Sequence, residues 1–256
     1  GNSTNTVKVR NVEIGTGKPK IIDPIVGVTK ADILKEAQAI RQLPCDVVEW
    51  RIDWFEHVFD IEKLKECAGA LKEALGDLPV LMTFRTKKEG GEKEIDNETY
   101  KMINNTMAAS GLVDVIDVEI FTGDEVVADM IGCAHDNNVK VIASNHDFFK
   151  TPAKSDIIYR LRKMQDMGAD ILKIAVMPQN KSDVLTLLEA TEEMVSCFAH
   201  QPVVTMSMGG MGVISRLCGE AFGSSMTFGA AKKASAPGQM GVEDLAVVLE
   251  DIHKAS

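Results

Sequence analysis

The chain has 256 residues, of which 45% are apolar and 26% are charged, and its 38 Asp and Glu against 28 Lys and Arg give a formal charge of −10. This composition is typical of a soluble globular protein and excludes the disordered, collagen-like and coiled-coil classes. With no run of Lys or Arg, the acidic balance argues against nucleic acid and membrane partners, and no apolar stretch approaches the roughly 18 residues that span a bilayer.

The first residues of the chain lack the apolar core of a targeting signal. We therefore expect residues 1–6 to be a disordered end, either processed or added for expression. Residues 7–18 come next, and within them Val7–Ile14 alternates with period two around Arg10-Asn11. That pattern predicts a short N-terminal β-hairpin, which would cover one end of the fold.

Eight short apolar runs rich in Val, Ile and Phe then alternate with amphipathic segments. Most of these runs are apolar on both faces, which is typical of parallel strands covered on both sides. The predicted strands are Lys20–Val26, Val47–Ile52, Val80–Phe84, Val113–Ile120, Val139–Ser144, Ile171–Val176, Val203–Met208 and Ser225–Phe228.

The segments between the strands have helical spacing. Thr29 and Asp32 provide a capping-like start for the first predicted helix, which continues through Ile33 and Ile40. The later predicted helices are Ile61–Leu75, Asn97–Ser110, Glu125–Asn137, Asp156–Met167, Lys181–Phe198, Val213–Ala221 and Val242–Lys254.

Eight strand–helix units in roughly 235 residues match the size of a (β/α)₈ barrel. We therefore predict an α/β protein in which residues 1–256 form a single TIM-barrel domain with a short N-terminal β-hairpin. A doubly wound open sheet is the alternative, although it usually has fewer strands and a Gly-rich fingerprint that Ile25-Val-Gly-Val-Thr29 lacks.

The active site of such a barrel lies at the carboxyl ends of its strands, so the polar residues at those positions are the candidate functional residues. They are Glu49, Arg51, Asp53, Arg85, Glu89, Asp117, Glu119, Asn145, His146, Asp147, Lys173, Ser207, Lys232, Lys233 and Ser235.

Lys173 is the strongest single candidate, because it is the one polar side chain in the run Ile171–Val176. Burial disfavours the charged ammonium, so the amine should tend to lose its proton. A neutral lysine in an apolar pocket is a nucleophile suited to imine formation with a ketone or an aldehyde. The alternative is a structural ion pair with a carboxylate such as Glu119, because buried ion pairs also perturb pKa values.

His146 is the one histidine at the end of a predicted strand, in Ser144-Asn-His-Asp-Phe148. There it could transfer protons near neutral pH, and a purely structural histidine is the alternative. Metal binding together with Glu49, Asp117 or Glu119 is a further option. The H-x-H or H-E-x-x-H spacing typical of metal sites is missing, so we expect no metal.

Arg51, Arg85 and Arg216 are predicted to gather at the same mouth of the barrel. Arginine suits bidentate recognition of a carboxylate, so these residues favour a small anionic ligand. Ion pairing with neighbouring carboxylates is the alternative. The small-residue loop Gly229–Gln239 has the composition of a movable lid or of a passive loop.

Several motifs from about Lys18 to the C-terminus resemble those of the type I 3-dehydroquinate dehydratases, in order and at family-like spacing. These motifs are Glu49-Trp-Arg51, Thr83-Phe-Arg85, Glu89-Gly-Gly91, Ser144-Asn-His-Asp147, Lys150-Thr-Pro152, Lys173-Ile-Ala-Val-Met-Pro178, Gly212-Val-Ile-Ser-Arg216 and Ala234-Ser-Ala-Pro-Gly-Gln239. The chain departs from the family pattern at Pro24, Val28, Leu172 and Gly209, none of which is a proton-transfer residue.

The resemblance implies a hydro-lyase of the shikimate pathway, which leads to the aromatic amino acids. Such an enzyme converts 3-dehydroquinate to 3-dehydroshikimate through a lysine Schiff base, with syn elimination of water and without a metal or cofactor. By position, Lys173 is the imine lysine, His146 the general acid/base and Glu89 its partner. The residues implied to hold the substrate carboxylate and the lid are Arg216, Ser235 and Gln239, and those implied to meet the ring hydroxyls are Glu49, Arg51 and Arg85.

The expected partner is therefore a small carboxylate substrate, with a second copy of the chain as a homodimer. Five scattered cysteines without a C-x-x-C pair favour reduced thiols and hence a cytoplasmic enzyme. Two alternatives remain at this stage. One is another imine-forming barrel of the class I aldolase type, with Met208–Gly212 as a partial phosphate cradle, and the other is a barrel that binds a metabolite without catalysis.

Overall fold

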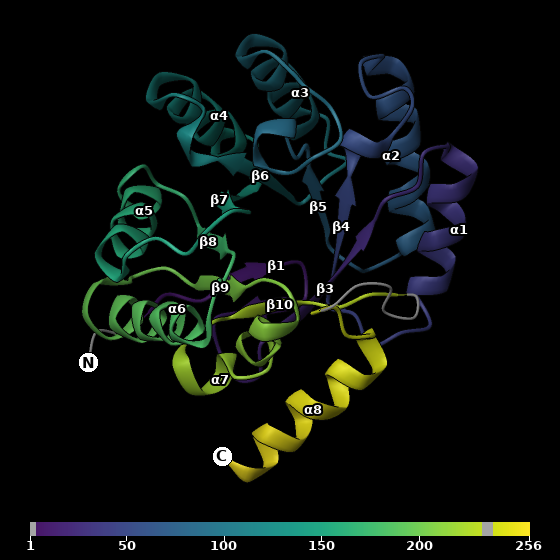
Figure 1. Cartoon of the computed structure of the whole chain (residues 1–256). Helices are drawn as coiled ribbons and strands as arrows, with labels where there is room; N and C mark the ends of the chain where they lie inside the picture. Colours follow the sequence, from purple (N-terminus) through teal and green to yellow (C-terminus); the bar gives the residue numbers. More distant parts are fainter. Residues whose placement is uncertain (1–3, 232–237) are drawn as a thin grey trace.

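The eight predicted apolar runs form the parallel strands of a barrel in the computed structural model, which describes residues 4–231 and 238–256 (Figure 1). The strands are β3 (Lys20–Ile25), β4 (Val47–Arg51), β5 (Val80–Thr83), β6 (Val115–Glu119), β7 (Lys140–Asp147), β8 (Ile171–Val176), β9 (Val203–Ser207) and β10 (Met226–Phe228). Neighbours in the chain are neighbours in the sheet, β10 pairs with β3, and a bridge from Val203 to Ser224 joins the two remaining edges. The predicted barrel of β-then-α units is confirmed.

Helices surround the strands (Figure 1). They are α1 (Lys30–Ile40), α2 (Ile61–Leu75), α3 (Asn97–Ala109), α4 (Asp124–Asp136), α5 (Lys154–Asp166), α6 (Lys181–Glu193), α7 (Gly219–Phe222) and α8 (Val242–Ala255). The predicted cap of the first helix is present, because Thr29 Oγ1 accepts a hydrogen bond from the Asp32 N–H at 3.1 Å. No helix in the described ranges is long and apolar enough to cross a membrane.

The predicted helix Val213–Ala221 is wrong. The chain instead forms a 3₁₀ turn over Gly210–Arg216 and then the four-residue α7. Ser215 Oγ donates to the carbonyl of Gly212 at 2.7 Å and accepts from the Ser207 N–H at 2.8 Å, so the turn is bonded to the end of β9. A Cβ at Gly212 would lie 2.1 Å from the Ser207 carbonyl oxygen, so this close approach requires glycine. These tertiary contacts override the helical spacing.

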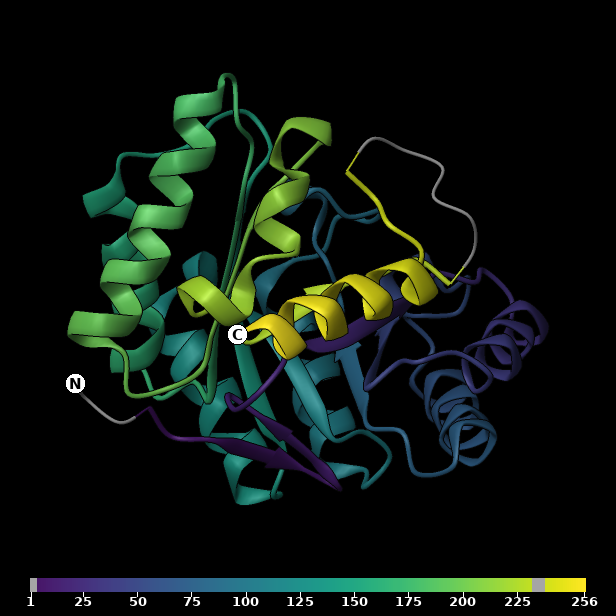
Figure 2. The ribbon, with the colours of Figure 1, turned by 90° about the horizontal axis from the view of Figure 1, so that it is seen from below.

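The predicted hairpin is present as β1 (Val7–Val9) and β2 (Val12–Ile14), which pair antiparallel. Figure 2 shows it at the end of the barrel opposite to the face seen in Figure 1. Val7, Val9 and Ile14 are buried against the apolar residues that fill the barrel interior. The hairpin therefore seals the amino-terminal end of the barrel and leaves the carboxyl end open for a site.

Part of the expected disordered end at residues 1–6 has hydrogen-bond partners in the structure. The Asn5 N–H donates to the His200 carbonyl at 2.8 Å, and Asn5 Nδ2 donates to Gln201 Oε1 at 2.8 Å. Residues 1–3 lie outside the described residues.

Candidate active site

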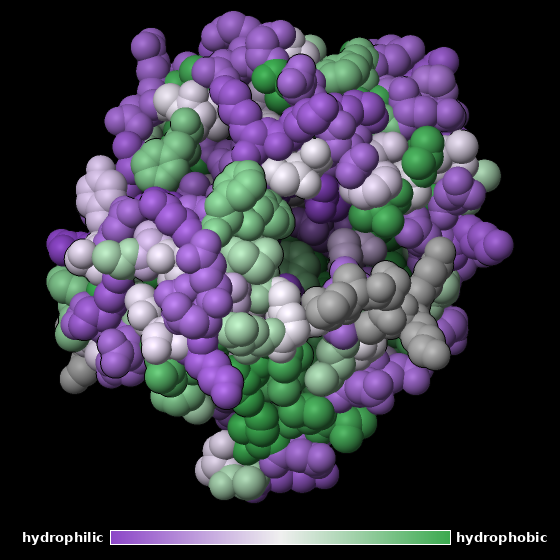
Figure 3. Space-filling model, viewed as in Figure 1, coloured by the Kyte–Doolittle hydropathy of each residue, from purple (hydrophilic) through white to green (hydrophobic). Residues whose placement is uncertain are grey.

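Along β4 to β8 the residues that face the barrel interior change from apolar to polar toward the carboxyl end. Side chains two positions apart in a strand point to the same side, so each strand contributes an ordered series. The apolar layer consists of Val47, Leu81, Val115, Ile142 and Ile171. Two residues further along the same strands come Glu49, Thr83, Asp117, Ser144 and Lys173, all of them buried. Figure 3 shows this face of the molecule hollowed near its centre.

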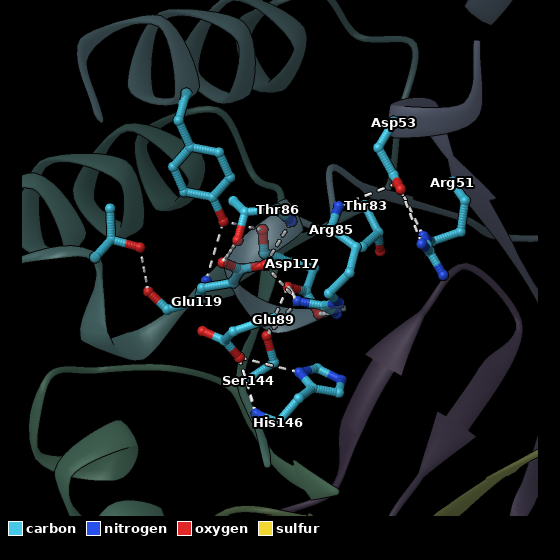
Figure 4. Close-up of polar contacts among 12 residues, drawn as sticks. Arg51, Asp53, Thr83, Arg85, Thr86, Glu89, Asp117, Glu119, Ser144 and His146 are labelled. Atoms are coloured by element: carbon cyan, nitrogen blue, oxygen red, sulfur yellow. Dashed lines mark hydrogen bonds and ion pairs between the residues drawn. The ribbon is translucent and has the colours of Figure 1, made fainter. Parts of the chain in front are cut away.

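Arg85 lies at the centre of a network of hydrogen-bonded ion pairs (Figure 4). Its Nη1 and Nη2 donate to the two oxygens of Asp117 at 3.1 and 3.0 Å, and Nη1 also donates to Glu119 at 2.9 Å and to Ser144 Oγ at 3.1 Å. Burial alone would raise the pKa of Asp117, but the cations of Arg85 and Lys173 hold it below its ordinary value. The site therefore contains fixed negative charge beside Lys173.

Glu119 accepts hydrogen bonds from Arg85 and Thr86, the residues that follow β5. It accepts hydrogen bonds from the Thr86 N–H at 3.0 Å and from Thr86 Oγ1 at 2.6 Å, in addition to its bond from Arg85. The proposed structural ion pair between Lys173 and Glu119 is therefore not formed. Glu49, another predicted site residue, accepts a hydrogen bond from Thr83 Oγ1 at 2.9 Å.

Arg51 leaves the end of β4 and is held by the neighbouring Asp53 (Figure 4). Its Nε and Nη2 donate to the two oxygens of Asp53 at 2.9 and 2.8 Å, a bidentate pair that fixes the guanidinium plane. Asp53 also accepts from the backbone N–H groups of Arg85 and Glu92, each at 3.1 Å. One buried carboxylate thus ties the chain after β4 to the chain after β5.

Glu89 and His146 are in direct contact although 57 positions separate them. Glu89 lies in the 3₁₀ turn Lys87–Glu89, and His146 lies near the end of β7. Glu89 Oε1 accepts the His146 backbone N–H at 2.8 Å and lies 3.1 Å from the ring Nδ1, and Figure 4 shows the other carboxylate oxygen turned away from the histidine. The turn therefore fixes both the backbone and the ring of His146.

The environment moves the pKa values of this pair in opposite directions. Burial, followed by the positive charges of Arg85, Lys173 and Arg51, lowers the pKa of His146 well below its usual value. Burial and the nearby Glu119 carboxylate raise the pKa of Glu89 to about 8. The imidazole is therefore neutral near pH 7, which is the form that accepts a proton.

Lys173 lies in β8 with 5% of its surface exposed. Ser144 is its partner in the β7–β8 register, and His146 follows Ser144 by two residues, so Lys173 and His146 face the same interior. The Nζ atom lies 4.4 Å from the centre of the Phe228 ring, and no carboxylate of the described residues forms an ion pair with it. Burial lowers the pKa of Lys173, opposed by Glu49 and assisted by Arg85.

Arg216 lies at the end of the 3₁₀ turn after β9, and its carbonyl accepts a hydrogen bond from Thr227 Oγ1 at 2.9 Å. Thr227 and Phe228 are neighbours in β10, and Phe228 is the residue whose ring lies beside Lys173. The Arg216 backbone therefore lies next to β10. Its Nε is buried without a hydrogen-bond partner among the described residues, and burial lowers its pKa. A half-buried guanidinium with an unpartnered Nε is suited to an anionic ligand.

The structure brings most of the predicted site residues to the carboxyl end of the barrel, but not all of them. Asn145 accepts a hydrogen bond from Arg160 of α5 at 2.9 Å, and Asp147 accepts one from the Phe149 N–H at 2.9 Å, so neither joins the network around Arg85. Gln239 is exposed, and Ser235 lies outside the described residues, as do Lys232 and Lys233. The sequence placed Asp53 at a strand end without a role, considered Asp117 only as a possible metal ligand, and gave no role to Thr86 or Phe228. For Asp117 the available signal was its alternation with Glu119 in β6, whereas Thr86 carried none.

The arrangement can form an imine at Lys173, move a proton at His146 and hold an anion at Arg216. Within the two described ranges, no three side chains of the His, Cys, Asp or Glu type are placed to hold a metal ion.

Comparison with known proteins identifies a family. A family model described as type I 3-dehydroquinase matches residues 21–256. The chain is 54% identical to a 3-dehydroquinate dehydratase of Clostridioides difficile (strain 630), over 97% of this chain and 98% of that protein. It is 55% identical to a 3-dehydroquinate dehydratase of Salmonella agona (strain SL483), over 98% and 99% of the two chains.

Solved structures agree with these relatives. A crystal structure of a type I 3-dehydroquinate dehydratase from Clostridium difficile with covalent modified comenic acid has a TM-score of 0.97 at 53% identity and covers 99% of each chain. The 3-dehydroquinate dehydratase from Enterococcus faecalis has a TM-score of 0.90 at 45% identity, over 96% of this chain and 98% of that one. The resemblance inferred from the motifs is confirmed.

Proposed function

The chain belongs to the type I 3-dehydroquinase family, and we propose that it dehydrates 3-dehydroquinate through an imine on Lys173, with His146 as the general acid and base. The observation that carries the proposal is a buried amine that faces the same barrel interior as a neutral imidazole. Membership of this family favours the dehydratase over both alternatives, the aldolase-type barrel and the barrel without catalysis.

Lys173 supplies the electrophile in this mechanism. Its lowered pKa makes the neutral amine more available, and the amine attacks the ketone carbon and expels water to give an imine. The protonated imine draws electrons from the adjacent carbon, so a proton on that carbon becomes removable. The carboxylates of Asp117 and Glu49 lie near this positive charge and stabilise it.

His146 then moves the proton. An ionised Glu89 accepts a hydrogen bond from Nδ1–H, which leaves Nε2 as the free base that takes the proton beside the imine. The resulting imidazolium returns the proton to the departing hydroxyl group, which leaves as water. The same group serves both steps, in agreement with a syn elimination. Hydrolysis of the product imine releases 3-dehydroshikimate and restores Lys173.

The remaining residues position the ring. Arg216 holds the substrate carboxylate, and Ser235 and Gln239 belong to the segment that covers it in this proposal. Glu49, Arg51 and Arg85 meet the ring hydroxyls. Support for the anchor comes from the buried Arg216 Nε, which has no partner among the described residues. A fixed carboxylate decides which ring carbon faces His146, and this orientation contributes to catalysis.

Borohydride trapping tests the proposal. With 3-dehydroquinate present, reduction should add one ligand-derived mass to the intact protein, and digestion should locate it on the peptide with Lys173. Release of the conjugated product, followed by its ultraviolet absorbance, should stop once the adduct is complete. Without substrate the mass should stay unchanged. An adduct on Lys232 or Lys233 would overturn the assignment of the imine lysine.

Replacement of Arg216 by alanine is expected to weaken substrate binding by about 2 to 5 kcal/mol, because a charge-assisted contact in a buried site loses one partner. The Michaelis constant should rise far more than the turnover number falls. The Michaelis constant of Arg216→Lys should lie between those of the parent and of Arg216→Ala. The measurement is steady-state kinetics together with the affinity for simple carboxylate inhibitors. The control is Arg41→Ala, an exposed arginine on the outside of the barrel. Unchanged affinities in Arg216→Ala would remove its role as anchor.

Cytoplasmic location and a homodimeric state are further parts of this proposal. The family resemblance supports both, and the reduced state of the cysteines supports the first, because all five are free thiols.

A further inference from the structure

Phe148 lies between His146 and Gly90, the residue that follows Glu89. Its ring is nearly parallel to the His146 imidazole, with 10° between the planes and 6.1 Å between the centroids. On the other side it lies against Gly90, the residue after Glu89, where an added Cβ would be 2.3 Å from the ring Cε2. The ring therefore joins the chain after β7 to the turn that carries Glu89.

Gly90 permits this contact in two ways. It lacks a Cβ, and its φ of +91° lies in the left-handed region that glycine adopts without strain. Gly91 also permits a close contact because it lacks a Cβ, since a Cβ there would be 1.8 Å from the Arg85 carbonyl oxygen. The two glycines after Glu89 therefore pack closely against the Arg85 backbone and the Phe148 ring.

We propose that Phe148 is a positioning residue, which holds the Glu89 turn against His146 and shields the imidazole from water. This inference rests on the proposed function of His146 and adds a residue that acts through it. Phe148 is 40% exposed, whereas the His146 side chain that it stacks on is 8% exposed, which fits a phenyl ring on the solvent side of the imidazole. The charged groups around the imidazole are Glu89 in the 3₁₀ turn, Arg85 after β5, Lys173 in β8 and Arg51 at the end of β4.

The shielding has a measurable consequence. Burial is the main cause of the low pKa of His146, and removal of the ring admits water without removing any of the surrounding charges. In Phe148→Ala the pKa of His146 should therefore rise toward its ordinary value. The rise of kcat/KM near pH 8 belongs to Glu89, and a second limb at lower pH belongs to His146. This lower limb should move to higher pH, and kcat should fall by about tenfold, because the pair is no longer held in register.

Phe149→Ala is the matched control. Phe149 is the adjacent residue in the chain, is 84% exposed and has no ring contact with a described residue. It should leave the pKa of His146 and the pH profile unchanged.

Gly90→Ala tests the same contact from the opposite side. The new methyl group should displace the Phe148 ring and reproduce the shift in pH profile. Gly111→Ala is its control, because Gly111 also has a positive φ, +75°, but has no atom within 4 Å of an added Cβ. The comparison separates the strain of a left-handed alanine from the loss of the ring contact.

The decisive measurement is the pKa of His146 in the resting protein, followed by NMR and assigned with His146→Ala. A rise in both Phe148→Ala and Gly90→Ala, and in neither control, supports the positioning role. An unchanged pKa in Phe148→Ala overturns it. The NMR titration does not depend on turnover, so it can support or overturn the positioning role even if kinetics of His146→Ala show that another group is the acid/base.

Discussion

Replacement of Lys173 by methionine is expected to abolish turnover, with a loss of at least about 10⁴-fold, and to abolish the borohydride adduct. Without the amine no imine forms, so the carbon beside the ketone keeps its weakly acidic proton. Methionine has a similar length and suits the apolar strand Ile171–Val176, so the variant should fold. The measurements are steady-state turnover, intact mass after reduction, and a thermal unfolding curve that verifies the fold.

Lys150→Met provides the control, because Lys150 is an exposed lysine just after β7, near the same end of the barrel. It should keep parental turnover and form the adduct at Lys173. Appreciable turnover by folded Lys173→Met would contradict the imine mechanism. An adduct that persists in this variant would show that a different lysine reacts with the substrate.

Replacement of His146 by alanine is expected to separate imine formation from proton transfer. The amine of Lys173 can still attack the ketone, so reduction should still trap a ligand-derived adduct. Proton removal and departure of the hydroxyl group lose their catalyst, and turnover should fall by about 10²–10⁴-fold. His146 can also assist imine formation and hydrolysis, so trapping should be slower and should capture the product imine as well.

Glu89→Gln distinguishes the ring of His146 from its orientation. The amide keeps a hydrogen-bonding oxygen but cannot ionise, so the variant should lose less activity than His146→Ala. In the parent, Glu89 ionises near pH 8. The ionised carboxylate accepts a hydrogen bond from Nδ1–H of His146, and this leaves Nε2 unprotonated and free to act as the base. Activity should therefore rise with pH toward that value in the parent and lose this rise in Glu89→Gln. If His146→Ala turns over near the parental rate, the acid/base must be another group, with Glu89 the first to examine.

The architecture was predictable from local patterns. Strands covered on both faces leave uninterrupted apolar runs, and helices packed on one side leave apolar residues at helical spacing, so eight units could be recognised from neighbouring residues alone. The cap at Thr29 and the hairpin around Arg10-Asn11 followed in the same way, from residues within a few positions of each other. The seventh helix failed because Ser215 bonds to the end of β9, a partner that helical spacing does not reveal.

Some features of the site could likewise be predicted from local sequence, and others depend on the tertiary structure. The candidacy of Lys173 could be inferred from the sequence, because its apolar neighbours lie in the same strand and imply burial of the amine. That Lys173 forms no ion pair with Glu119 was decided by the tertiary structure, in which Arg85 and Thr86 donate hydrogen bonds to the Glu119 carboxylate. The contact of Glu89 with His146 also depends on the fold, because it joins groups 57 positions apart. Periodicity is set by adjacent residues, whereas a hydrogen bond depends on where the packing of distant strands places two atoms. This is why the barrel and the burial of its lysine are encoded locally and the contact between Glu89 and His146 is not.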